Sequence, residues 1–77
     1  MRIQVSQQVM RLLRSQAAPD IRRMIESLRT NPYPEWAREI PDKPHWYEVP
    51  IGGYWLIYEV DTSGPETVIR VAAAENI

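Results

Sequence analysis

The sequence predicts an α+β fold in which an antiparallel sheet packs one face against a pair of helices. Three patterns predict it. Gly52-Gly53 separates two runs rich in aromatic and branched residues, a strong hairpin signal because the tightest turns need positive φ. Two earlier segments place apolar residues at intervals of three and four, the spacing of amphipathic helices. A further strand-like run follows the turn signal at residues 61–65.

The chain opens with a predicted strand and a first helix. Met1, Ile3 and Val5 alternate with polar residues, as in a half-buried strand, although the pattern does not indicate its place in the sheet. Ser6 is placed to cap the helix that follows, because its hydroxyl can accept a hydrogen bond from an early helical N–H. The apolar residues of that helix are Val9, Met10, Leu12, Leu13 and Ala17, with Arg11 and Arg14 on its polar side.

The second helix begins at Pro19-Asp20, because proline suits the first turn and a carboxylate suits the positive end of the helix dipole. Asn31-Pro32 is expected to end it, since the residue before a proline is driven out of helical geometry. The apolar side carries Ile21, Met24, Ile25 and Leu28, and the polar side carries Arg22, Arg23, Glu26 and Arg29.

The segment 30–44 is rich in proline and predicts little regular structure. Trp36 and Ile40 lie four residues apart, which favours a single helical turn over residues 35–39. After the hairpin, residues 66–73 predict a last strand, in which Ile69 lies opposite Tyr58. The predicted order is therefore βααβββ in one domain spanning residues 1–77.

The Gly-Gly loop also sets the register of the hairpin, with Val49 opposite Leu56 and Tyr47 opposite Tyr58. Side chains in a strand alternate between the two faces of the sheet. One face then forms a wall of the core with Tyr47, Val49, Ile51, Tyr54, Leu56, Tyr58 and Val60. The other, which we name the open face, carries Trp46, Glu48, Pro50, Trp55, Ile57 and Glu59, joined by Val68, Arg70 and Ala72 from the last strand.

Composition limits the function classes. The 77 residues contain nine basic and ten acidic residues, a formal charge of −1 that offers no global attraction for nucleic acid or anionic membrane. The absence of cysteine excludes disulfides and thiolate chemistry, and the single histidine excludes most zinc sites. No apolar run is long enough to cross a bilayer, so we expect a cytoplasmic protein without a metal or other cofactor.

These landmarks together resemble the RelE/ParE family of toxins from type II toxin–antitoxin systems. The resemblance rests on Ser6, Val9 and Leu13 in the opening, Asn31-Pro32 after the second helix, residues 37–40, the tyrosine-flanked hairpin 46–60 and the strand 68–71. It implies the same α+β fold, and a partner antitoxin segment that wraps helix and sheet surfaces.

The positions that carry ribonuclease chemistry in this family differ here. Its ribonuclease members use cations on the open face to stabilise charge on a phosphate, and a group near the C-terminus that moves protons. This chain has Glu48, Pro50 and Trp55 at such places, the tail begins Ala72-Ala73-Ala74, and only Arg70 remains as an open-face cation. We therefore expect no catalytic residue and a toxin-fold protein that acts through protein binding. The alternative is a ribosome-dependent mRNA endoribonuclease whose cations are relocated to Arg38 and Lys43.

Two sets of candidate binding residues follow. An antitoxin-like protein or a second copy of the chain is expected on the open face, at Trp46, Glu48, Pro50, Trp55, Ile57 and Arg70. RNA binding, including the ribosome, is the less favoured use of a second set, because Glu26 dilutes its charge. That set is Arg22, Arg23, Arg29, Arg38 and Lys43.

Overall fold

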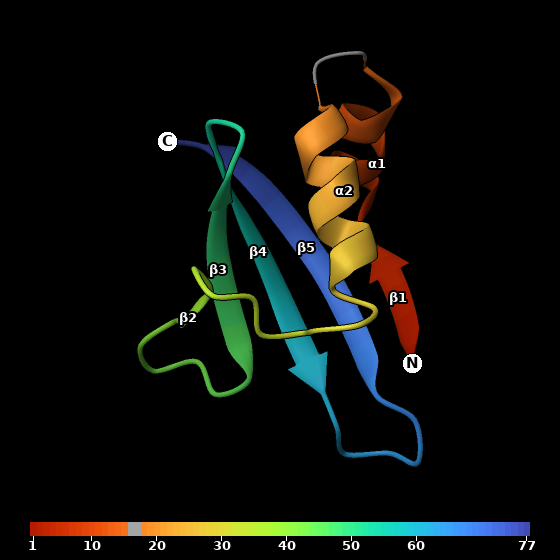
Figure 1. Ribbon diagram of the computed structural model, residues 1–77. Coiled ribbons are helices and arrows are strands. Elements are labelled where there is room, and N and C mark those ends of the chain that lie inside the picture. Colours follow the sequence, from red (N-terminus) through yellow and green to blue (C-terminus); the bar gives the residue numbers. More distant parts are fainter. Residues whose placement is uncertain (16–17) are drawn as a thin grey trace.

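The computed structural model describes residues 1–15 and 18–77 and has an α+β architecture, with two helices and a five-stranded mixed sheet (Figure 1). The elements are β1 (Arg2–Val5), α1 (Gln7–Arg14), α2 (Pro19–Ser27), β2 (Arg38–Glu39), β3 (Trp46–Ile51), β4 (Tyr54–Asp61) and β5 (Val68–Asn76). Their order across the sheet is β1-β5-β4-β3-β2. Strand β1 runs parallel to β5, and every other pairing is antiparallel.

Both helices form where the sequence predicts them. The Ser6 hydroxyl caps α1 by accepting from the Val9 N–H at 3.3 Å. Pro19 occupies the first turn of α2 and Asp20 follows it. Helix α2 ends at Ser27, earlier than the Asn31-Pro32 signal, and hydrogen-bonded turns continue the chain to Asn31. Ala17, expected on the apolar side of α1, lies outside the described residues.

The hairpin of β3 and β4 has the predicted register. Val49 lies opposite Leu56, Pro50 opposite Trp55 and Tyr47 opposite Tyr58. Gly52 and Gly53 both adopt positive φ, 57° and 81°, as the two-residue turn requires. The faces of this hairpin therefore follow the alternation of the sequence.

Two predictions before and after the hairpin were wrong. The segment expected to form a helical turn over residues 35–39 instead places Arg38–Glu39 as a short edge strand on β3, with Arg38 opposite Glu48. Strand β5 spans Val68–Asn76 rather than 66–73, and Tyr58 faces Val71 rather than Ile69. Ala72 has no Cα partner in β4 and forms a β-bulge. After this bulge the side chains of β5 exchange faces of the sheet, so Ala74 lies opposite Leu56 and is buried in the core.

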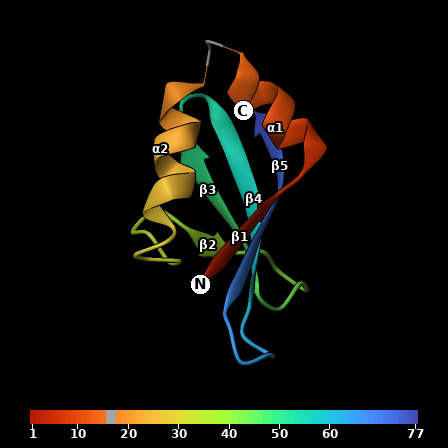
Figure 2. The ribbon, with the colours of Figure 1, turned by 90° about the vertical axis from the view of Figure 1, so that its right-hand side faces the viewer.

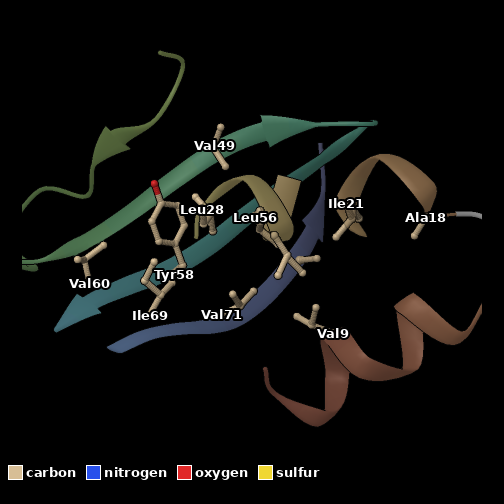
Figure 3. Close-up of a cluster of buried hydrophobic side chains, with 12 residues drawn as sticks. Val9, Ala18, Ile21, Leu28, Val49, Leu56, Tyr58, Val60, Ile69 and Val71 are labelled. Atoms are coloured by element: carbon tan, nitrogen blue, oxygen red, sulfur yellow. The ribbon is translucent and has the colours of Figure 1, made fainter. Parts of the chain in front are cut away.

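The core lies between the helices and one face of the sheet. Figures 1 and 2 show both helices on the same side, over the half of the sheet nearest the hairpin tip. Val9 from α1, Ile21 from α2 and Leu28, which directly follows α2, pack in one cluster with Leu56 and Tyr58 from β4 (Figure 3). Of the predicted core wall, Val49, Leu56, Tyr58 and Val60 are buried, but Tyr47, Ile51 and Tyr54 remain partly exposed. On the helical side, Val9, Ile21, Ile25 and Leu28 are buried as expected, whereas Leu12, Leu13 and Met24 are partly exposed and Met10 is exposed.

Candidate protein-binding face

The open face is the side of the sheet that points away from the helices, and its apolar side chains form a strip. Trp55 and Ile57 are successive residues of β4 on this face, while Trp46 and Pro50 come from β3. All four are partly exposed, because neither helix covers this side of the sheet. We name them the apolar strip. Val68 also faces this side, but it is only 8% exposed and adds little accessible surface.

Arg38 covers one end of the strip. Its guanidinium carbon lies 5.0 Å from the centre of a Trp55 ring, and its Nε lies 2.7 Å from the Glu48 carboxylate. Strand β2 causes this arrangement, because it places Arg38 directly opposite Glu48 at the edge of the sheet. A cation over an indole at such an exposed site contributes about 0.5–1 kcal/mol. The prediction that Arg70 is the only cation left on this face was therefore wrong.

The other end of the strip carries a second group of charges. Arg70 pairs with Glu59 at 3.2 Å and with Asp61 at 2.9 Å. Hydrogen bonds from the Ser63 hydroxyl, the Ser63 N–H and Arg70 hold the pKa of the Asp61 carboxyl well below its ordinary range. The same two carboxylates raise the pKa of Arg70. Asp61 and Arg70 therefore both stay ionised near neutral pH.

The loop before β3 brings a further cation beside Trp46. The Lys43 ammonium lies 5.9 Å from the centre of a Trp46 ring. Asp42 and His45 both adopt positive φ, 64° and 73°, and so bend the loop at either side of this lysine. A hydrogen bond from the Ile40 N–H to the Trp46 carbonyl holds the loop against β3.

The charges around the apolar strip balance. The described residues place as many carboxylates as cations on this side: Arg2, Arg38, Lys43 and Arg70 against Glu48, Glu59, Asp61 and Glu75. Two of these four cations, Arg38 and Arg70, already contact a carboxylate. A polyanion such as RNA therefore gains little by binding here, since its affinity depends on cations that neutralise phosphates.

The predicted RNA-binding residues do not form one surface. On α2, Arg23 pairs with Asp20 at 3.2 Å and Arg22 donates to the Leu13 carbonyl at 2.7 Å, while Arg29, in the turn after α2, pairs with Glu26 at 3.2 Å. The other two members, Arg38 and Lys43, lie over Trp55 and Trp46 of the open face, on the other side of the sheet from the helices. The partner-binding residues, by contrast, all lie on the open face.

Two tyrosines on the core side of the sheet also have shifted pKa values. Burial, followed by the neighbouring tyrosines, raises the pKa of Tyr58, and burial also raises that of Tyr47. The Tyr58 hydroxyl donates to the Pro32 carbonyl at 2.8 Å, and the Tyr47 ring stacks on the Tyr58 ring at 5.7 Å. These shifts move the pKa values away from neutrality, so both tyrosines stay protonated and act as structural residues.

Sequence reasoning missed Arg38 as a residue of the open face. The sequence contains no clear signal for strand β2, because Arg38 and Glu39 are two successive charged residues and lack the alternation of apolar and polar residues that marks a strand. Among residues 1–15 and 18–77, no three acidic or histidine side chains gather in a way that could hold a metal ion. Within the same residues, no helix is long and apolar enough to span a membrane.

Comparison with known proteins gives no relative from which to transfer a function. No family model matches the chain, and neither the curated proteins nor the solved structures give a match.

Proposed function

We propose that this chain is the toxin-fold component of a type II toxin–antitoxin pair, RelE/ParE-like in fold, and that it acts by binding a protein rather than by cleaving RNA. The order of sequence landmarks supports the family assignment, and a helix pair packed on one face of a meander is compatible with it. The binding surface is the apolar strip, with an antitoxin-like protein as its partner.

The observation that carries this proposal is the apolar strip itself. Trp46, Pro50, Trp55 and Ile57 remain partly exposed on a sheet face that neither helix covers. Aromatic side chains surrounded by charged residues are typical of the centres of protein interfaces. The balanced charge around the strip favours a protein partner over a nucleic acid, because nucleic-acid binding requires excess positive charge.

The test is to measure association of wild type and Trp55→Ala with any small protein that is encoded next to this chain. Titration calorimetry should show binding weakened by about 2 kcal/mol or more, roughly thirtyfold, because the substitution removes one of the two indole anchors of the strip. Sedimentation of each protein alone detects self-association through the same face. The matched control is Trp36→Ala, since Trp36 is 72% exposed and lies outside the strip.

Two results would contradict the proposal. The first is a monomeric wild type that does not bind its encoded neighbour. The second is salt-sensitive binding to RNA or ribosomes, with codon-positioned mRNA cleavage that disappears in Arg70→Ala, which would revive the endoribonuclease alternative. The variants must retain the wild-type circular dichroism spectrum, so that lost binding is not lost folding.

A further inference from the structure

We propose a second binding site, on the helix side of the sheet, that accepts an extended acidic peptide segment with an apolar side chain at its centre. The site is a groove of about 430 Å³ between α1 and the end of the sheet that carries the hairpin tip. Leu12, Tyr54 and Ala74 contribute apolar surface, and Gln8, Arg11 and Asn76 contribute polar groups. It lies on the opposite side of the sheet from the apolar strip and is independent of the function proposed above.

One arginine without an ion-pair partner among the described residues, Arg11, lines the groove, and a second, Arg14, lies beside it. Arg11 lines it and also lines a smaller hollow of about 230 Å³, formed with Gln7, Met10 and Arg14. Neither Arg11 nor Arg14 makes an ion pair with any described residue, whereas Arg23 on α2 and Arg29 just after it each do. No carboxylate lines either hollow among the described residues, and Glu75 faces the other way, opposite Trp55 on the open face. The two guanidinium groups therefore remain available to carboxylates of a ligand.

An unpaired edge of β5 runs along this groove. Strand β1 pairs only with Val68–Val71 of β5, so the part of β5 after Val71 has no neighbouring strand on that side. Ile77 donates to the Gly53 carbonyl on the β4 side, so the backbone groups of Asn76 and Ala74 point away from β4, towards the groove. The Gln8 side chain already donates to the Ala74 carbonyl at 2.9 Å, which confirms that a donor reaches this edge.

These features together favour an extended peptide over other ligands. A peptide strand can pair with the backbone groups of Asn76 and, by displacing the Gln8 amide, with the Ala74 carbonyl, as in the recognition of sheet edges by added strands. Its apolar side chain would contact Leu12 and Tyr54, and flanking carboxylates would meet Arg11 and Arg14. A nucleic acid fits less well, because Arg11 is the only cation among the described residues that line the groove and the chain as a whole carries a formal charge of −1.

A designed probe tests the site directly. In a peptide with Glu, Leu and Glu at alternate positions and Ser between them, all three side chains lie on one face of a strand. Titration of this peptide into the ¹⁵N-labelled full chain should shift the amide resonances of Gln8, Leu12 and Asn76. Arg11→Glu should raise the dissociation constant at least tenfold. Arg29→Glu changes the net charge equally but lies beyond the C-terminal end of α2, outside the groove, and should leave the dissociation constant within about twofold.

The outcomes separate this proposal from the first one. Trp55→Ala should bind the probe like wild type, because Trp55 lies on the open face. Arg11→Gln should give an intermediate loss, which guards against an effect of the introduced negative charge alone. The proposal is overturned if the probe shifts no groove resonances, if Arg11→Glu and Arg29→Glu weaken binding equally, or if a single-stranded RNA of equal charge binds the groove more tightly than the peptide.

Discussion

Single side chains hold the segment between α2 and β2 against the sheet. The Tyr58 ring is fully buried, yet its hydroxyl reaches the Pro32 carbonyl at 2.8 Å and satisfies both polar groups. Such a hydrogen bond contributes about 1 kcal/mol, and leaving the carbonyl without a partner would cost more. Tyr33 then packs edge-on against Tyr47 at 5.2 Å between ring centres. One core residue therefore fixes the path of the chain after α2.

At the same scale, Asp61 gives a pH-dependent prediction. Its pKa is lower in the folded chain than the ordinary value of about 3.9, because of Ser63 and Arg70. A lowered carboxyl pKa stabilises the fold above the ordinary pKa, and this contribution is lost as the pH falls towards the folded value. Urea unfolding of wild type and Asp61→Asn should show a difference in stability that is constant from about pH 5 to 7 and shrinks below about pH 4.

Ser63→Ala serves as the second variant in this experiment, since it removes the largest cause of the shift while Arg70 remains. It should lose part of the same pH dependence. A difference between wild type and Asp61→Asn that does not change with pH would show that the carboxylate has no such role.

At the scale of elements, the hairpin organises both faces of the sheet. The Gly52-Gly53 turn sets a register in which Leu56 enters the core and Trp55 stays on the open face. A shift of one residue would exchange the two faces, because side chains alternate with a period of two. The turn therefore determines which residues are available to a partner.

Gly53→Ala should destabilise the chain by about 1–2 kcal/mol, because residue 53 has a φ of 81°, where a Cβ atom is strained. No atom lies within 4 Å of a Cβ built there, so the cost comes from the backbone rather than from a clash. Chemical denaturation measures the change. Gly64→Ala is the control, since Gly64 has equal space without positive φ, and its effect should be smaller. Equal effects of both substitutions would contradict the role of the turn.

At the scale of the whole molecule, stability depends on a small core shared by all the main elements. Its members come from α1, α2, β3, β4 and β5, and β1 adds the partly buried Ile3 and Val5. A domain of this size buries a limited fraction of its surface, so each large core side chain contributes a substantial part of the stability.

Leu56→Ala should therefore lower the free energy of unfolding by about 2–5 kcal/mol, through lost burial and the cavity left behind. Leu56 has no exposed surface, whereas its neighbour Trp55 is partly exposed on the other face. Thermal unfolding of both alanine variants compares the two faces directly. A larger loss for Trp55→Ala than for Leu56→Ala would contradict the assignment of the faces.

The sequence by itself determined the local elements and the faces of the central hairpin. Ser6, Pro19 and Gly52-Gly53 act through backbone geometry and hydrogen bonds within a few residues, so their effects can be predicted without knowing the fold. The alternation of apolar and polar residues likewise predicted which side of β3 and β4 is buried.

Only the tertiary structure decided the features that depend on distant segments. The parallel place of β1 beside β5, the bulge that turns Ala74 inward and the strand that brings Arg38 over Trp55 all require pairing between residues far apart in the chain. The groove beside Arg11 likewise depends on distant segments. Strand β1 pairs with β5 only as far as Val71, so among the described residues the edge of β5 that faces away from β4 has no neighbouring strand next to α1. Long-range pairing is chosen by the packing of the whole core, and no short stretch of sequence contains that information.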